Sequence, residues 1–192
     1  MFARRSSRRF VAAALLLALS GAAVATADEY KVDAIHSSVV FKVKHVESTN
    51  FYGTFAKVSG SVSTEGDAIK SLSVTVDAES VQTRNDKRDD HLRGPDFFDT
   101  KQFPEIKFEA KEVKAAGDGF EAAGELTLHG TTKPLTVKLA KTGAGKNPMG
   151  KDVIGVEATF TIKRSDYGMS GYVGKGVGDE VTLMVALECA KD

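Results

Sequence analysis

The sequence of 192 residues contains a single cysteine, Cys189, only four prolines and no excess of either charge. One cysteine excludes an intrachain disulfide and any metal site built from several cysteines. The 26 basic and 26 acidic side chains balance only because residues 1–27 hold four arginines and no acid. Without that segment, 22 basic and 26 acidic side chains remain, which is a net charge of −4. A general nucleic-acid binder is therefore not expected, since it needs basic surface to displace counterions from phosphates.

The first 27 residues have the pattern of a secretory signal peptide. Arginines are followed by an apolar run over 10–19 and then by Ala25-Thr26-Ala27, which is the order of basic region, apolar region and cleavage site. We expect cleavage after Ala27, a periplasmic location and one domain over residues 28–192. The apolar run is shorter than the roughly 20 residues that cross a bilayer, which argues against an uncleaved anchor. The general secretory route is favoured over the twin-arginine route, because Phe10 follows the arginine pair directly.

The rest of the chain shows the two-residue periodicity of β-strands and no long stretch at helical spacing. Leu72, Val74 and Val76, for example, share one face of their segment, and Ser73 and Thr75 share the other. Alternation of this kind predicts eight strands, over residues 37–46, 53–64, 69–78, 106–113, 119–129, 134–141, 152–164 and 178–189. One apolar and one polar face on each strand is typical of an antiparallel sheet, and eight strands of about ten residues favour a closed all-β barrel.

Two segments interrupt this alternation. Residues 80–104 are polar and then aromatic, and they predict a short helix near 86–93 that is capped by Asn85 or Asp86. Residues 165–178 hold five glycines and two tyrosines, which predicts a flexible loop with at most one helical turn. Both segments can act as lids over the mouth of the barrel, or they can simply plug its end.

Signatures of common active sites are absent from the sequence, which has no GxSxG, P-loop, dinucleotide-binding, HExxH or CxxC motif. The histidines, His36, His45, His91 and His129, lie in separate segments without the close spacing of a local metal site. His45 is in phase with the apolar face of its strand, where it can be structural or can contact a ligand, and His129 precedes a turn. Cys189 is expected to be a small buried hydrophobic residue. We predict no catalytic residue, no metal and no cofactor.

Charged and aromatic side chains crowd the first interrupting segment. Arg88 and His91 stand one helical turn apart and can receive an anionic head group, although a run of mixed charges is usually a solvated helix face. Phe97, Phe98 and Phe103 follow directly. These rings are expected to pack into the barrel or onto an apolar ligand.

Several motifs in chain order resemble those of the YceI family of secreted, polyisoprenoid-binding, lipocalin-like proteins. They span residues 29–189 and include 30–37 (YKVDAIHS), 41–45 (FKVKH), 88–92 (RDDHL), 96–99 (DFFD), 103–108 (FPEIKF), 124–133 (GELTLHGTTK), 164–168 (RSDYG) and 177–181 (VGDEV). The resemblance implies an eight-stranded antiparallel barrel around a long apolar tunnel. It also implies an amphiphile inside that tunnel, namely a polyisoprenoid, an isoprenoid quinone or a fatty-acid-like lipid. Homodimers are suggested by the family, although no strand edge in the sequence identifies an interface.

We therefore predict a periplasmic binding or carrier protein for a long-chain amphiphile, without catalysis, without nucleic acid and without a stable membrane span. The candidates for the apolar wall are Val39, Phe41, Val43, Phe55, Val74, Val76, Phe97, Phe98, Phe108, Leu126, Leu128, Phe160 and Ile162. The candidates for the polar end are His45, Arg88, His91, Arg164 and Tyr167. Two alternatives stay open, an enzyme that acts on a small amphiphile and a metal- or haem-associated partner of a membrane redox protein.

Overall fold

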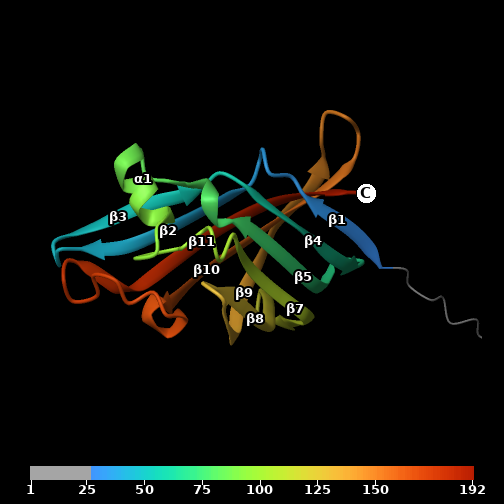
Figure 1. Ribbon diagram of the computed structural model, residues 1–192. Helices are drawn as coiled ribbons and strands as arrows, with labels where there is room; N and C mark the ends of the chain where they lie inside the picture. The colour runs from blue at the N-terminus through green and yellow to red at the C-terminus, as the bar shows by residue number, and fades with distance from the viewer. Residues whose placement is uncertain (1–26) are drawn as a thin grey trace, which may run out of the picture.

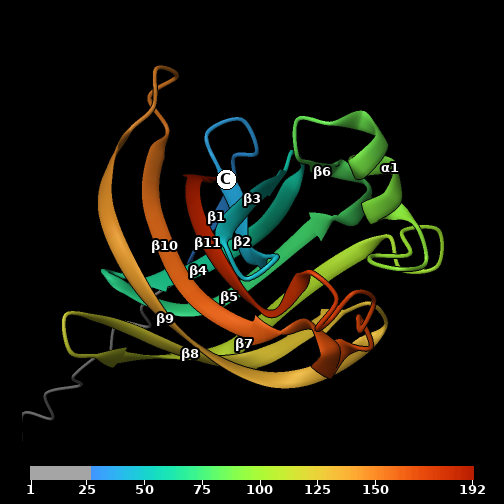
Figure 2. The same ribbon diagram turned by 90° about the vertical axis from the view of Figure 1, so that its left-hand side faces the viewer.

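The computed structural model describes residues 27–192, and eight of its strands form a closed antiparallel barrel (Figure 2). Around the ring the strands follow the order β1-β4-β5-β7-β8-β9-β10-β11, and β11 pairs again with β1. Their bounds are β1 (Asp28–Val32), β4 (Val58–Glu65), β5 (Ala68–Asp77), β7 (Glu105–Ala116), β8 (Gly119–Leu128), β9 (Thr131–Lys146), β10 (Asp152–Lys163) and β11 (Val177–Lys191). The predicted all-β barrel of eight antiparallel strands is confirmed.

Three further strands extend the sheet beyond the ring, and they are β2 (Ser38–His45), β3 (Thr49–Phe55) and β6 (Val81–Gln82). The branch arises at β11, which is long enough to have two partners along one edge. Its residues 189–191 pair with β1, and its residues 181–186 pair with β2. The loop between β1 and β2 passes Glu188, whose carbonyl accepts a hydrogen bond of 2.8 Å from the Asp33 backbone N–H.

The strand boundaries differ from the predicted ones in three places. The segment 53–64 contains parts of two strands, because Phe55 and Val58 are both buried but three residues apart, which breaks the two-residue alternation. β1 has no counterpart among the predicted strands, since Tyr30 is its only buried residue. β9 continues past the predicted 134–141 as an exposed ribbon paired with β10. In consequence β1 completes the ring at one end of β11, and β2 continues the wall beside β11 at the hollow end.

The barrel interior is packed solid at one end and hollow at the other. At the solid end, Cys189 of β11 is fully buried together with Val62 and Ile69. Farther along the same face of β11, Leu187 and then Val185 border open space inside the barrel. The inward face that forms the core at one end therefore forms the wall of a cavity at the other.

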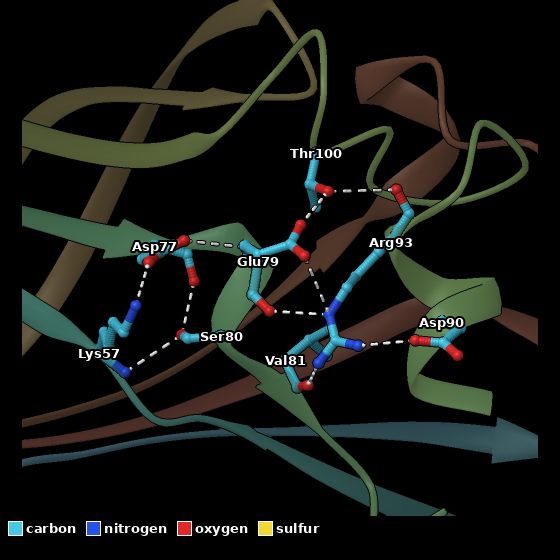
Figure 3. A network of polar contacts seen from close by, with 8 residues as sticks. All are labelled: Lys57, Asp77, Glu79, Ser80, Val81, Asp90, Arg93 and Thr100. Carbon is cyan, nitrogen blue, oxygen red and sulfur yellow. Dashed lines mark hydrogen bonds and ion pairs between the residues drawn. The ribbon is translucent and has the colours of Figure 1, made fainter. Parts of the chain in front are cut away.

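The α-helix α1 (Asp86–Arg93) lies beside β6 at the hollow end (Figure 2). Its bounds and its cap agree with the prediction, since the Asn85 side chain accepts a 3.0 Å hydrogen bond from the Arg88 backbone N–H. The 3₁₀ turn η1 (Ala78–Ser80) precedes β6, and η2 (Arg164–Tyr167) follows β10. Arg93 fastens the helix to η1 and β6 by donating hydrogen bonds to the Glu79 and Val81 carbonyls (Figure 3).

The described part of the chain contains no helix that is long and apolar enough to cross a membrane. Apart from Ala27, the predicted signal segment falls outside the described residues. Export and cleavage after Ala27 therefore stay predictions.

Candidate ligand-binding cavity

An apolar cavity of about 150 Å³, called here the main cavity, occupies the hollow end of the barrel. All apolar residues predicted for the tunnel wall line it, namely Val39, Phe41, Val43, Phe55, Val74, Val76, Phe97, Phe98, Phe108, Leu126, Leu128, Phe160 and Ile162. The lining also contains apolar residues that the sequence did not single out, namely Leu92, Ile106, Met169, Val177, Val181, Leu183 and Val185. Within residues 27–192, Arg164 is the single charged side chain of this lining. That the lining contacts a ligand stays a prediction.

A second apolar cavity of about 50 Å³, the inner cavity, lies deeper in the barrel toward the packed end. Val74, Phe108, Phe160 and Val185 border both cavities and form the partition between them. The two cavities follow one another along the inward face of β11. A chain-like ligand that enters the main cavity therefore meets this partition before it reaches the inner cavity.

Beside the main cavity lies a more polar pocket, called here the mouth, whose lining includes His45, Phe51, Arg88, His91 and Tyr172. The lining of the mouth and that of the main cavity share Phe41, Val43, Leu92, Phe97 and Val177, so the two spaces adjoin one another. The Arg88 guanidinium lies 4.6 Å from the centre of the Phe51 ring, where cation–π attraction favours it. Three of the predicted polar-end residues therefore meet at the mouth, and His45 is exposed at the end of β2 rather than enclosed in the barrel.

Hydrogen bonds fix the direction of the Arg88 side chain. Its Nε donates to Thr83 Oγ1 and its Nη2 donates to the Thr83 carbonyl, both at 2.7 Å. The Thr83 hydroxyl in turn donates to the buried carboxylate of Asp89. The cation is thereby held over the mouth without an ion-pair partner in direct contact among the described residues.

Three aromatic rings from two segments enclose one side of the mouth. The His91 ring of α1 meets the edges of Phe97 and Tyr172 at centre-to-centre distances of 5.1 and 5.7 Å. Phe97 and Tyr172 stack in parallel at 5.7 Å. Tyr172 was outside the predicted site, because it lies in the glycine-rich segment, where no strand periodicity indicates a direction. The two predicted lid segments, 80–104 and 165–178, thus meet at the mouth.

Arg164 stands in the wall of the main cavity and is only 4% exposed. Its Nε donates to the Gly178 carbonyl at 2.9 Å, and its Nη1 donates to the Met169 carbonyl at 2.7 Å. Burial lowers the pKa of Arg164, and the nearby charge of Asp179 opposes that shift. A guanidinium remains protonated in proteins, so Arg164 holds the loop that follows η2 and also places a positive charge beside the cavity.

Tyr167 lines neither the main cavity nor the mouth, in contrast to its predicted place at the polar end. It is buried in a cluster with Leu126, Leu128 and Met169, and burial raises the pKa of its phenol. The cause is the turn η2, which begins at Arg164 and ends the two-residue alternation of β10. The phase of the strand therefore does not extend to Tyr167.

The four histidines do not form one site. His45 and His91 share the mouth, but His36 lies in the β1–β2 loop and His129 lies in the β8–β9 turn. His129 and Gly130 both have positive φ, as a two-residue hairpin turn requires. The His129 ring packs at 4.6 Å from the Phe103 ring, and its Nε2 is buried without a hydrogen-bond partner.

His36 lies between two carboxylates on the outside of the barrel. Its Nδ1 is 2.8 Å from Asp33 Oδ2 and 3.7 Å from Glu188 Oε1. Among the described residues, this is the one group of three histidine or acidic side chains with the spacing of a metal site. None of its members lines the main cavity, the inner cavity or the mouth.

The His36–Asp33 pair predicts a pH-dependent stability. The hydrogen bond with Asp33 raises the pKa of His36 above 6.5, and the same bond lowers the pKa of Asp33 below 3.8. The contribution of His36 to the free energy of unfolding is complete below pH 6.5 and is lost as the pH rises through the raised folded-state pKa. The contribution of Asp33 to the free energy of unfolding is complete above pH 3.8 and is lost as the pH falls through the lowered folded-state pKa.

An NMR titration checks this pair directly. The His36 ring is expected to titrate above pH 6.5, with an inflection that returns toward 6.5 in the Asp33→Asn variant. An unchanged inflection in that variant would contradict the pairing.

Cys189 has the buried, apolar role that its position in the strand predicted, with 0% exposure. Burial raises the pKa of its thiol to about 11. Because the thiolate is the reactive form, the native protein should react with a thiol reagent at least ~100-fold more slowly than the guanidinium-unfolded chain at about pH 8. Similar rates for the two forms would mean that the end of β11 opens readily.

Comparison with known proteins agrees with this architecture. The family model described as a YceI-like domain matches residues 30–189. A UPF0312 protein of Yersinia pestis is 36% identical over 177 residues, which cover 90% of this chain and 91% of that protein. Among solved structures, Burkholderia cenocepacia BcnA aligns with a TM-score of 0.72 at 24% identity, covering 82% of this chain and 98% of BcnA.

A further solved structure shares the fold. It is a domain from Saccharophagus degradans that is described as polyisoprenoid-binding and as implicated in plant cell wall breakdown. It aligns with a TM-score of 0.67 at 18% identity and covers 85% of this chain and 98% of that domain. The family match over residues 30–189 takes in every barrel strand except the first two residues of β1 and the last two of β11, and the chain belongs to the YceI-like family.

Proposed function

We propose that this protein is a periplasmic binding or carrier protein for a long-chain amphiphile, such as a polyisoprenoid, an isoprenoid quinone or a fatty-acid-like lipid. The observation that carries the proposal is the main cavity, in which Arg164 is the single charged lining residue of the described chain. Such a wall offers few partners to a sugar or a nucleotide. An alkyl or isoprenyl tail, by contrast, gains about 0.8 kcal/mol for each CH₂ group that leaves water. The polyisoprenoid-binding description of the Saccharophagus degradans domain supports the same ligand class.

The polar head of the ligand has two cationic partners within reach of the apolar space. Arg88 and the two histidines serve a head that stays at the mouth, whereas Arg164 serves an oxygen atom that enters the cavity. Arg164 retains N–H groups beyond those that it donates to backbone carbonyls. Both arrangements favour a head that carries carbonyl, hydroxyl or anionic oxygen over a cationic head.

We assign no catalytic step to the cavity. General acid–base catalysis needs titratable groups within hydrogen-bond reach of the reacting atoms. The lining of the main cavity supplies only the Arg164 guanidinium, which keeps its proton, and apolar side chains. A bound amphiphile is therefore expected to leave the protein chemically unchanged.

Lipid extraction of the exported protein tests this function. The full chain is expressed with its leader and purified from the periplasm, and the solvent extract is analysed by mass spectrometry. We expect a mature N-terminus at Asp28 and one long-chain amphiphile in near-stoichiometric amount. The delipidated protein should rebind a fluorescent polyprenyl or quinone analogue and should return it unmodified. A protein that emerges empty and binds none of a polyprenol, a quinone and a fatty amide would overturn the proposal.

A further inference from the structure

Two exposed apolar side chains stand beside the mouth in strained backbone conformations. Val46, at the turn between β2 and β3, has φ of 41° and is 56% exposed. Tyr172, in the loop before β11, has φ of 60° and is 42% exposed. Positive φ is uncommon for any residue other than glycine, and it is a marked outlier for a β-branched residue such as valine.

The two residues belong to one continuous edge of the molecule. The Val46 backbone N–H donates a 2.7 Å hydrogen bond to the carbonyl of Gly176, in the loop that carries Tyr172. Figure 1 shows the β2–β3 turn and this loop at the same end of the molecule. Tyr172 is also a lining residue of the mouth. We call Val46 and Tyr172 the rim.

Packing inside the protein does not account for Val46, whereas the Tyr172 ring contacts His91 and Phe97. Asparagine or glycine is the usual choice at such turn positions, and strain of this kind costs about 1–3 kcal/mol per residue. The side chain of Val46 is more than half exposed, so burial returns little of that cost. A strained residue that the fold itself does not need is best explained by something outside the fold that contacts it.

The charges around the rim indicate what that contact is. The basic side chains that line the mouth are Arg88, His45 and His91, and none of the described lining residues is acidic, although the Asp96 carboxylate lies 3.0 Å from His91 Nε2. Lys44 precedes the β2–β3 turn and Lys175 follows Tyr172, whereas Glu47 is the acidic residue of the turn itself. Exposed apolar side chains with cations beside them are complementary to a lipid surface that carries anionic head groups. Tyrosine rings also favour the interface between membrane and water.

We propose that the rim docks the protein on an anionic lipid bilayer, with the mouth facing the membrane. This inference rests on the proposed function, because an amphiphile bound in the main cavity has to enter from a membrane or leave to one. Docking at the mouth lets the apolar tail move between the membrane and the protein without crossing water, since the mouth adjoins the main cavity. The preferred lipid is one with an anionic head, such as phosphatidylglycerol.

Vesicle sedimentation tests the docking. The mature protein is mixed with vesicles of phosphatidylcholine alone or of phosphatidylcholine with phosphatidylglycerol. We expect binding to the anionic vesicles that weakens with salt, and a loss of about tenfold or more in the double variant Val46→Asn, Tyr172→Asn. Asparagine tolerates positive φ, which offsets part of the cost of losing the Tyr172 contacts with His91 and Phe97, and a thermal melt checks that the variant stays folded. Met149→Asn removes a side chain that is 81% exposed in the β9–β10 connection and should leave vesicle binding unchanged.

The outcomes separate this inference from the proposed function. A parent protein that binds a dispersed short-chain polyprenyl analogue but not anionic vesicles would overturn the docking and leave the carrier function standing. Equal vesicle binding by the parent and the double variant would also overturn it. Sedimentation velocity tests whether a second copy of the chain binds the rim instead. If the parent is a dimer and the double variant is a monomer, the rim is a contact between two copies and the docking proposal is overturned.

Discussion

Replacing Val74 with tryptophan is expected to abolish the retention of a long-chain ligand while leaving the barrel folded. Val74 lies on β5 in the partition between the main and inner cavities, and it is only partly buried because empty space adjoins it. An indole ring at this position occupies the path of an extended tail. If about five CH₂ groups lose their burial, the loss is roughly 4 kcal/mol, or about 1000-fold in affinity.

The matched control is Thr75→Trp, one residue along the same strand. Thr75 faces the outer surface, beside Ser59 and Glu105, so its replacement adds the same ring without entering the barrel. Surface substitutions of this kind usually change stability by no more than about 0.5 kcal/mol. Mass spectrometry of co-purified lipid and the affinity for a fluorescent analogue should therefore be normal in Thr75→Trp and lost in Val74→Trp. Equal affinity in both variants would place the tail elsewhere.

The contrast between these neighbours also explains why the wall of the cavity could be predicted from the sequence. A strand sends successive side chains to opposite faces, so the apolar face of β5 identifies Val74 and Val76 as inward and Thr75 as outward. The closed barrel then brings the inward faces of its strands together. Residues of this kind were predictable because their direction depends on local chain geometry alone.

Other parts of the site depend on contacts that no local pattern records. Leu92 on α1 and Met169 in the loop after η2 reach the main cavity only because their segments fold back over the hollow end. Tyr172 reaches the mouth through a loop whose backbone has no periodicity. In the same way, the sheet branches because one edge of β11 pairs with β1 at one end and with β2 at the other. The alternation of apolar and polar residues along β11 does not show which strands pair with that edge.

The substitution Arg164→Met is expected to lower the free energy of unfolding by about 3 kcal/mol, because the buried acceptors around the guanidinium lose their donor. These acceptors are the Gly178, Met169 and Val177 carbonyls, and they fasten the loop after η2 to the start of β11. For a domain of this size the loss corresponds to a melting temperature lower by roughly 6–12 °C. Urea unfolding of delipidated protein measures the change, since a bound lipid would stabilise the native state and mask it.

Arg93→Met provides the comparison, because Arg93 also donates to two backbone carbonyls but does so near the surface. Its guanidinium bonds the Glu79 and Val81 carbonyls and the Asp90 carboxylate (Figure 3), and its side chain is 27% exposed. Water can replace a donor there, so we expect a loss of only about 1 kcal/mol. Equal losses of unfolding free energy in the two variants would show that water reaches the acceptors around Arg164. A larger loss for Arg164 means that the cavity wall is dry, which is the condition under which an apolar tail gains most from entering it.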